Sequence, residues 1–211
     1  MLPTPDYKLE KEGDVYSPAE DTFLLLDAIE QEMKFLRSTV NPKIVVEVGS
    51  GSGVVTTFIQ QLLADIPFIS LATDLNFYAT RCTKRTAEIN KVSETVDVVQ
   101  CDLVSAITKR LQGNVDLLVF NPPYVPTEEL AQNQSELCFA GGETGRCVLD
   151  RLMPHIPNLL SSQGVFYVIA LKQNNVPEML KKYANFLTGS IVLERWCGIE
   201  YLYVLKFQRI L

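Results

Sequence analysis

The chain has 211 residues, of which 47 % are hydrophobic and 21 % are charged, and this composition predicts one compact domain with a core of ordinary size. The sequence has no apolar run of about 18 residues and begins without the basic and then apolar pattern of a signal peptide, so we expect no membrane attachment and a location in the cytosol or nucleus. The formal net charge of −6 repels phosphate backbones, which disfavours unassisted binding of nucleic acid.

The thiols and the histidine favour neither metal binding nor a catalytic triad. The cysteines are Cys82, Cys101, Cys138, Cys147 and Cys197. They form no C-x-x-C pair, so neither a disulfide framework nor a zinc site is indicated, and we interpret them as buried reduced thiols. The single histidine, His155, lies in an apolar stretch, where a packed or surface role is expected.

The first predicted element is a helix that begins near residue 17 and ends near Phe35. Three start signals coincide there, because Ser17 can act as N-cap, Pro18 suits the first turn and Glu20 completes a capping box. Residues 1–40 are therefore expected to form an N-terminal extension and helix, followed by the core of the domain over residues 41–211.

In that core, short apolar runs alternate with amphipathic stretches, a pattern typical of repeated βαβ units. Strands are expected at 44–48, 68–73, 96–100, 115–120 and 164–170. Helices are expected at 54–63, 77–90, 104–111, 145–160 and 176–186. The predicted fold class is therefore α/β, with a mostly parallel sheet covered by helices on both faces.

The alternation ends at two strand-like runs, 191–196 and 201–207, which a short connection separates. Such spacing predicts a C-terminal antiparallel hairpin. The sequence contains no internal repeat or linker, so residues 1–211 are expected to form a single domain.

A glycine-rich turn follows the first predicted strand, in the order Glu47-Val48-Gly49-Ser50-Gly51-Ser52-Gly53. Such a turn lets the backbone approach a nucleotide closely, and we assign its three glycines to cofactor binding. Val54 breaks the dinucleotide fingerprint and no P-loop lysine is present. The acidic Glu47 suits a cationic amino-acid group, while a tight structural turn is the alternative interpretation of the glycines.

Acidic residues follow the next two predicted strands. Asp74 ends one of them, where its carboxylate can accept hydrogen bonds from ribose hydroxyls. Asp102 follows the other and can accept from an adenine amino group, while Leu103 can pack on the adenine ring. Each aspartate alone could equally be a helix N-cap, but with Glu47 three acids follow three successive strands.

The fourth predicted strand runs directly into Asn121-Pro122-Pro123-Tyr124. The carbonyl of Pro122 faces no competing N–H from Pro123, and with the Asn121 side-chain oxygen it offers two acceptors to the two hydrogens of an NH2 group. Tyr124 adds a flat face for stacking. A proline-stiffened turn with an incidental tyrosine is the alternative.

This loop suits methylation of a planar nitrogen. The lone pair of an amide or exocyclic amine is delocalised, so two acceptors that hold the hydrogens can align the nitrogen with an electrophilic methyl group and favour the charge that develops on it. The loop by itself does not distinguish glutamine from adenine.

With these motifs in place, the chain resembles the class I S-adenosylmethionine-dependent methyltransferases, and within them the HemK-like protein glutamine methyltransferases in their short eukaryotic and archaeal form. The resemblance spans nearly the whole chain. It is carried by the runs 16–22, 47–53, 121–124 and 140–146 and by the final hairpin.

The resemblance implies a seven-stranded Rossmann-like methyltransferase fold. It also implies cofactor contacts from Thr22, Glu47, Gly49, Asp74, Asp102, Leu103 and Asn121. The expected cofactor is S-adenosylmethionine, with S-adenosylhomocysteine as product. The expected substrate is the glutamine of the Gly-Gly-Gln motif in the class 1 translation release factor, with histone lysine and nucleic-acid adenine as alternatives.

The resemblance further implies a heterodimer with a small zinc-binding activator protein. In the usual strand order 3-2-1-4-5-7-6, the strand at 96–100 lies at an edge, and an uncovered apolar edge invites pairing. We therefore expect the activator to add a strand there. Coverage of its valines by flanking helices is the alternative.

The segment from Thr127 to Glu143 is long for a loop, and long ordered loops often cover a site. It is acidic, with glutamates at Glu128, Glu129, Glu136 and Glu143. This suits a basic protein surface, although a solvated acidic loop fits as well. The glycines of 141–142 and 145 could let it close over a substrate.

Two other function classes remain open. A scaffold that binds cofactor without catalysis is weakened by the intact Glu47, Asp74, Asp102 and Asn121. A nicotinamide-dependent oxidoreductase is weakened by Val54 and by the lack of an evident catalytic acid.

Overall fold

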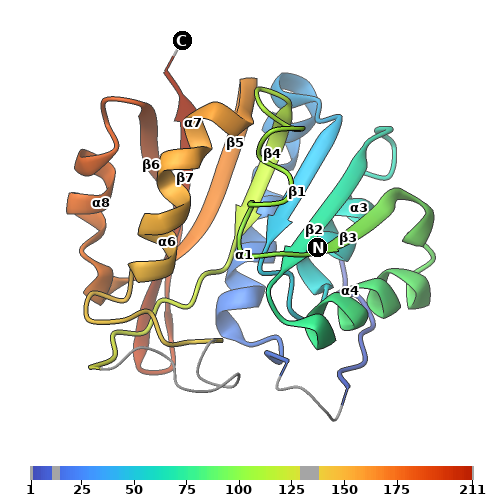
Figure 1. The fold of residues 1–211 in the computed structure, drawn as a ribbon, viewed down its shortest axis with the longest axis horizontal. Helices are drawn as coiled ribbons and strands as arrows, with labels where there is room; N and C mark the ends of the chain where they lie inside the picture. The colour runs from blue at the N-terminus through green and yellow to red at the C-terminus, as the bar shows by residue number, and fades with distance from the viewer. Residues whose placement is uncertain (1, 11–14, 129–137, 211) are drawn as a thin grey trace.

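The structure is a computed structural model that describes residues 2–10, 15–128 and 138–210. In these ranges, seven strands form one sheet in the order β3-β2-β1-β4-β5-β7-β6 (Figure 1). The strands are β1 (Ile44–Val48), β2 (Ile69–Asp74), β3 (Val96–Gln100), β4 (Val115–Phe120), β5 (Leu160–Leu171), β6 (Leu187–Cys197) and β7 (Glu200–Arg209). The first five are parallel, and β7 is antiparallel to both of its neighbours. The predicted strand order, the terminal hairpin and the edge position of β3 are confirmed.

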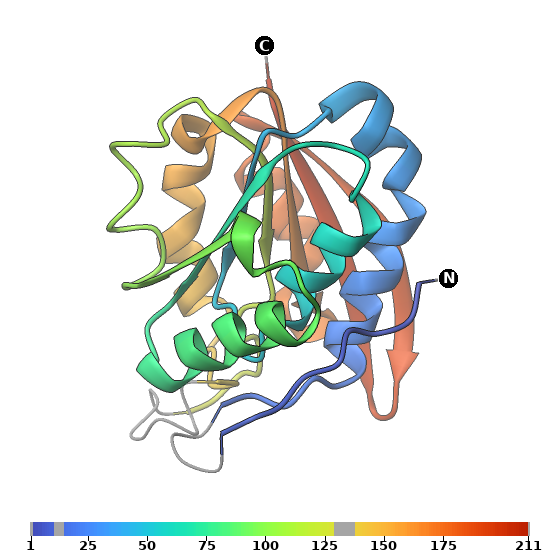
Figure 2. The same cartoon turned by 90° about the vertical axis from the view of Figure 1, so that its right-hand side faces the viewer.

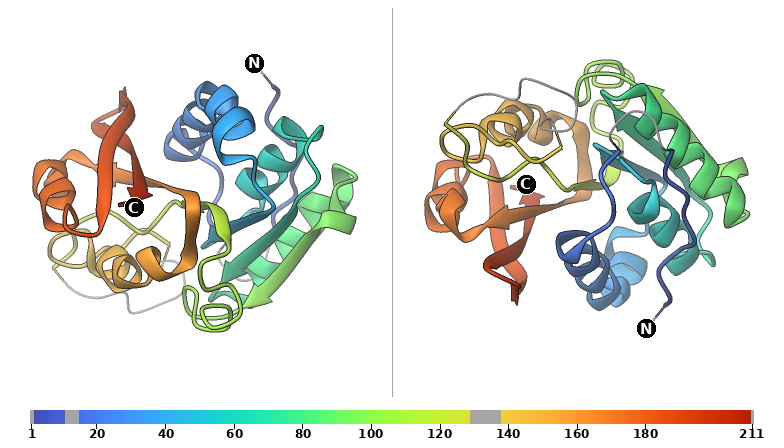
Figure 3. Two further views of the ribbon diagram at one scale, coloured as in Figure 1. Left: turned by 90° about the horizontal axis from the view of Figure 1, so that it is seen from above. Right: turned by 90° about the horizontal axis from the view of Figure 1, so that it is seen from below.

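Helices cover both faces of the sheet, as expected (Figure 3). The α-helices described are α1 (Glu20–Gln31), α2 (Met33–Phe35), α3 (Val54–Leu62), α4 (Phe77–Ile89), α6 (Cys147–Leu152), α7 (Ile156–Leu159) and α8 (Val176–Lys182). Shorter turns are the π-helical η1 (Leu36–Val40) and the 3-10 segments η2 (Ser93–Thr95), η3 (Met153–His155) and η4 (Lys172–Asn174). None of the helices described could cross a lipid bilayer.

Two apolar cores form because successive strand residues point to opposite faces. In β5, Tyr167 packs in the cluster with α1 and α3, whereas its neighbour Phe166 packs in the cluster with α6, α7 and α8. Both side chains are fully buried. A strand that is apolar on both faces therefore occupies the sheet interior, as parallel strands between two helix layers require.

The N-terminal residues 2–10 form an extended segment that crosses α1 and α4 (Figure 2). The Leu2 N–H donates to Glu30 at 2.7 Å, the Asp6 N–H to Asn90 at 3.3 Å and the Glu10 N–H to the Cys82 thiol at 3.4 Å. The segment thus leads from α1 to the carboxyl edge of the sheet.

The predicted start of the first helix is wrong. α1 begins at Glu20 with Ala19 in the N-cap position, so Ser17 does not cap it. Instead, the Asp21 carboxylate accepts the Thr22 N–H at 2.7 Å and so satisfies a free donor of the first turn. After a single turn residue, Glu32, the helical path continues as α2 to Phe35, the predicted end, and then through η1 to the left-handed Asn41.

Three other predicted helices differ in extent. Residues 104–111 form hydrogen-bonded turns, with N–H groups of Ile107 and Arg110 each bonded three residues back. The segment 145–160 is divided into α6, η3 and α7 because Pro154 and Pro157 interrupt the helical hydrogen bonds. The last helix, α8, ends at Lys182 instead of near residue 186.

The cysteines differ in exposure, although all of them are free thiols. Cys82 and Cys197 are buried as predicted, while Cys101 and Cys138 are half-buried. Cys147 is exposed at the start of α6, so the prediction of burial is wrong there. His155 is exposed, in line with a surface role.

Candidate active site

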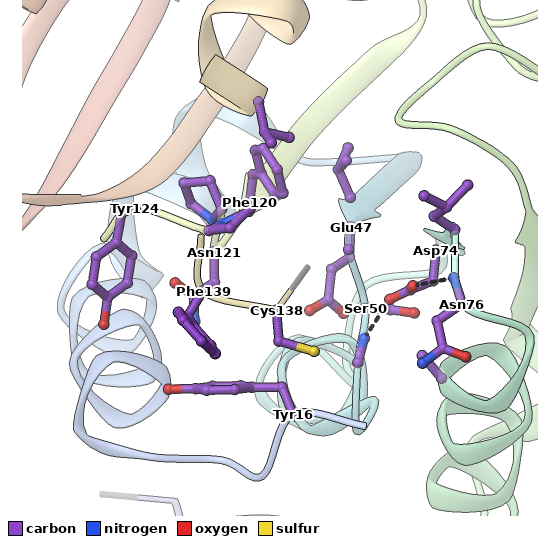
Figure 4. A pocket seen from close by; sticks show the side chains of 18 of the residues that line it. Tyr16, Glu47, Ser50, Asp74, Asn76, Phe120, Asn121, Tyr124, Cys138 and Phe139 are labelled. Carbon is purple, nitrogen blue, oxygen red and sulfur yellow. Dashed lines mark hydrogen bonds between the residues drawn. The ribbon is translucent and has the colours of Figure 1, made fainter. Parts of the chain in front are cut away.

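A cavity of about 370 Å³ opens at the carboxyl edge of the sheet (Figure 4). Parallel strands end together at this edge, so the loops after β1, β2, β3 and β4 converge on it. The predicted site residues that line the cavity are Thr22, Glu47, Gly49, Gly51, Asp74, Asp102, Leu103, Asn121, Pro122, Pro123 and Tyr124. Figure 4 shows two ends: Glu47 and Asp74 lie at one, and Asn121, Tyr124 and Tyr16 at the other.

The glycines of the first loop serve two purposes. Gly49 and Gly51 line the cavity with φ of 64° and 50°, which L side chains rarely adopt. Gly53 lies outside the cavity lining, at the N-cap of α3, and a Cβ there would be 2.5 Å from the Thr83 Cα. Gly53 therefore permits close packing of α3 on α4, which differs from the cofactor contact predicted for it.

Glu47 is a buried carboxyl group beside the first turn of α3. One of its oxygens accepts the Thr56 N–H at 2.9 Å and the Thr56 hydroxyl. Burial nevertheless raises the pKa of Glu47 to about 8. A cation bound in the cavity would favour the ionised carboxylate, so the residue fits the ammonium group of an amino-acid moiety.

Asp74 has both carboxylate oxygens in hydrogen bonds within the loop region. One accepts the Gly51 N–H at 2.9 Å and the other the Asn76 N–H at 2.8 Å. Burial raises the pKa of Asp74. The alternative role as helix cap belongs to Asn76, whose side chain accepts the Tyr78 N–H. Each oxygen of Asp74 retains a lone pair for a hydroxyl donor.

Asp102 also lines the cavity and forms an ion pair with Arg151 of α6. The sequence did not single out Arg151, which also lines the cavity. Leu103 has a φ of 50°, a left-handed conformation uncommon for a residue with a branched side chain. The turn carries the Leu103 side chain to the cavity, as predicted.

At the opposite end, Asn121 presents an acceptor. Its amide NH2 donates to Asp21 at 2.9 Å, which turns the side-chain oxygen away from the carboxylate. That oxygen is buried and has no hydrogen-bond partner among the described residues. A buried acceptor without a donor is costly, so this atom fits the hydrogen of an incoming NH2 group.

Asp21 connects the side chains at the Asn121 end of the cavity by hydrogen bonds. The sequence alone did not assign it to the site. It is buried, and its oxygens accept from the hydroxyls of Tyr16 at 2.9 Å and Tyr124 at 3.1 Å, besides Asn121 and Thr22. All four partners are donors, so the position requires a carboxylate. The acidic first turn of the helix was the available signal, but only the fold brings it to Asn121.

Tyr124 differs from its predicted role. Its ring is only 8 % exposed, and its hydroxyl is held by Asp21 and lies 3.5 Å from a Glu200 oxygen. Burial and the two carboxylates raise the pKa of Tyr124 far above its usual value, so the hydroxyl remains a donor. The more accessible flat ring in the cavity belongs to Phe139, which is 43 % exposed.

Phe139 lies in a segment tied to the residue after the Asn-Pro-Pro-Tyr run. The Val125 N–H donates to the Phe139 carbonyl at 3.0 Å, and the Gly141 N–H donates to the Val125 carbonyl at 2.8 Å. Phe139 and Asn121 line the same cavity, and in the view of Figure 4 the Phe139 ring overlaps Asn121. A ring at this point can cover the flat face of a group held by Asn121.

Of the acidic segment from Thr127 to Glu143, the structure describes residues 127–128 and 138–143. Glu129 and Glu136 fall outside the described residues, so the suggestion that this acidic loop contacts a basic protein surface stays a prediction. The expected hinge is not supported at Gly145, where a Cβ would be 2.2 Å from the Tyr124 carbonyl oxygen. Arg146 is buried and paired with Glu178. Both residues anchor the end of the segment.

Comparisons with known proteins show that the chain is similar to methyltransferases. A family model described as the methyltransferase small domain matches residues 9–190. Methyltransferase HEMK2 of Homo sapiens is 46 % identical over 200 residues, which cover 93 % of this chain and 91 % of that protein. The eRF1 methyltransferase catalytic subunit mtq2 of Schizosaccharomyces pombe is 36 % identical over 100 % of this chain and 97 % of that protein.

A solved structure is similar over the same extent. The Mtq2-Trm112 complex of E. cuniculi, described as responsible for methylation of the eRF1 translation termination factor, contains a chain that matches with a TM-score of 0.66 and 28 % identity. The match covers 93 % of this chain and 99 % of that one.

Proposed function

The chain belongs to the methyltransferase small domain family, and from this premise we propose that it methylates the side-chain amide nitrogen of the glutamine in the Gly-Gly-Gln motif of the class 1 translation release factor. It acts as the catalytic subunit of a heterodimer. Two similar proteins support this substrate, since one is an eRF1 methyltransferase catalytic subunit and another a putative protein N5-glutamine methyltransferase.

The observation that carries the proposal is the partnerless oxygen of Asn121. Asp21 holds the amide of Asn121 so that this oxygen faces the incoming group, and the Pro122 carbonyl supplies a second acceptor. Together they hold the two hydrogens of a glutamine NH2 and favour positive charge on its nitrogen. A strong base is unnecessary, because the nitrogen can lose its proton after attack.

The other end of the cavity fits S-adenosylmethionine, which when bound supplies an electrophilic methyl group. Glu47 would hold its ammonium group from a buried position, and Asp74 would hold its ribose hydroxyls from a half-buried one. Asp102 and Leu103 would hold the adenine. The residues therefore place a cofactor at one end and an acceptor nitrogen at the other.

Mass spectrometry of the release factor tests this function. After reaction with the partner-bound enzyme and S-adenosylmethionine, we expect a single methyl group on the glutamine, and none when that glutamine is replaced by alanine. Methyl groups on adenine of nucleic acid or on a histone lysine, with none on the release factor, would contradict the proposal and favour those alternatives.

Phe139 offers a test of how the substrate is held. Replacing Phe139 by leucine keeps an apolar side chain but removes the flat ring, and we expect the KM for the release factor to rise roughly 10-fold, the upper range of aromatic stacking. Phe139→Tyr should stay near the wild-type value. Steady-state kinetics measures this, and an unchanged KM in Phe139→Leu would contradict a contact with the amide.

For the heterodimer, we propose that the partner is a small zinc-binding activator that adds a strand to β3. This strand has β2 as its only strand neighbour in the described ranges, and Val98 and Val99 are half-buried. Because the Cys101 N–H donates to the Asp74 carbonyl of β2, the alternation of a strand turns the N–H of Val98 outward. A partner strand would find a free donor there.

Val98→Pro should therefore abolish co-purification with the activator. Proline removes the outward N–H and is tolerated on an edge strand, so cofactor binding by the variant should remain. Asp97→Ala, which changes only an exposed side chain of the same strand, is the control. A Val98→Pro protein that still forms the heterodimer would place the activator elsewhere.

A further inference from the structure

The turn between β6 and β7 exposes large apolar side chains. Ile199, at the turn itself, is 95 % exposed, and Trp196, two residues before the turn glycine, is 63 % exposed. Single exposed apolar residues are common on protein surfaces. These two lie within four positions of each other on one hairpin, together with the half-buried Tyr201 opposite Trp196. We call Trp196, Ile199 and Tyr201 the hairpin tip.

The aromatic part of the hairpin tip is already ordered. The ring centroids of Trp196 and Tyr201 are 5.0 Å apart at an interplanar angle of 71°, and those of Tyr201 and Tyr203 are 5.1 Å apart at 73°. The Lys172 ammonium lies 5.9 Å from the centre of the Tyr201 ring. Side chains that are held in this way lose little conformational entropy when a partner binds.

The hairpin tip adjoins the acceptor end of the cavity. Because β7 is antiparallel to the parallel strands, it begins at the edge where β1, β2 and β4 end, and Figure 1 shows the turn projecting there. Glu200, the residue after Ile199, lines the cavity and lies 3.5 Å from the Tyr124 hydroxyl. A macromolecule that inserts one side chain beside Asn121 must place its neighbouring surface near this turn.

The charges around the turn indicate the chemistry of the occupant. Glu194 is opposite Tyr203 and lies on the aromatic face of the hairpin, whereas Glu200, opposite Cys197, lies on the other face with Arg195, which pairs with Asp27 of α1. Two carboxylates therefore border the hairpin tip, one on each face, and the Lys172 ammonium lies by the Tyr201 ring on the aromatic face. Such a surface fits an apolar segment with basic residues.

We propose that the hairpin tip docks the protein substrate, by contact with apolar and basic residues next to the side chain that is methylated. This inference rests on the proposed function, because a folded protein has to be recognised by surface around its acceptor glutamine. Trp196 and Ile199 are the anchors, and the acidic residues are Glu194, beside the aromatic side chains, and Glu200, on the side of the cavity.

Kinetics of the partner-bound enzyme with full-length release factor test the proposal. Ile199→Asp and Trp196→Ala should each raise the KM and the Kd for the release factor roughly 30-fold, as loss of an interface anchor does. The kcat at saturating substrate and the Kd for S-adenosylmethionine should stay within about 2-fold, because neither residue lines the cavity. Phe186→Ala is the matched control, an aromatic residue 61 % exposed just before β6, at the opposite end of that strand.

The results have separate meanings. KM values of both variants equal to that of Phe186→Ala would overturn the docking inference while leaving glutamine methylation intact. Loss of the heterodimer in Trp196→Ala would assign the surface to the activator, and conversion of a wild-type homodimer to monomers would assign it to a second copy. Absence of methylation by the wild-type enzyme would instead refute the proposed function.

Discussion

Replacing Asp21 by asparagine is expected to lower kcat for release-factor methylation roughly 100- to 1000-fold, the loss typical when one preorganised group of a reaction site is removed. The change is nearly isosteric. Asp21 accepts hydrogen bonds only from donors, so an NH2 group at this position must meet a donor. The Asn121 amide relieves that conflict by flipping, which presents its NH2 to the substrate NH2.

Asp21 is thus a positioning residue, which acts through Asn121. The double variant Asp21→Asn/Asn121→Asp separates this role from simple structural damage, because the carboxylate introduced at position 121 would accept from the new NH2 and again point an acceptor into the cavity. We expect the kcat of the double variant to be at least 10-fold higher than that of Asp21→Asn, because the acceptor at position 121 is again held in place. Asp65→Asn, an exposed aspartate paired with Arg37, should behave as wild type. If the double variant were no faster than Asp21→Asn, orientation of Asn121 would not be the cause.

Replacing Asn121 by alanine should also reduce kcat roughly 100- to 1000-fold. The variant removes the acceptor itself, whereas the Kd for S-adenosylmethionine should change little if Glu47 and Asp74 dominate cofactor binding. Single-turnover transfer of a labelled methyl group measures the chemical step directly. Asn158→Ala, on the exposed side of α7, is the matched control. Methyl transfer by Asn121→Ala at the wild-type rate would show that the Asn121 oxygen does not hold the acceptor nitrogen, whereas a variant that binds cofactor normally and keeps full activity in cells without methyl transfer would favour the scaffold interpretation.

The strands could be predicted because their signal is local. Runs such as 115–120 are apolar on both faces, and short spacing between the last two runs leaves a hairpin as the natural connection. The motifs at the ends of β1, β2 and β4 were located by the same reasoning, since parallel strands bring their carboxyl ends together. The family resemblance supplied the strand order that this reasoning could not.

The acceptor end of the cavity was less predictable, because its contacts join residues far apart in the chain. Asp21 and Asn121 are separated by 100 positions, and no local pattern indicates that the first turn of α1 reaches the loop after β4. The prediction that the Tyr124 ring stacks on the substrate also failed because the contacts of this residue are distant in the sequence. Its hydroxyl had no visible partner in the sequence, whereas the fold supplies two carboxylates.

The position of β7 has a consequence for how the chain folds during synthesis. In the described part of the sheet, β6 pairs only with β7, and β7 inserts between β6 and β5. The ribosome releases β6 first, so this strand waits without a partner until residues up to 209 emerge. Its unpaired backbone groups are then open to wrong pairing until β7 inserts beside β5 and closes the sheet.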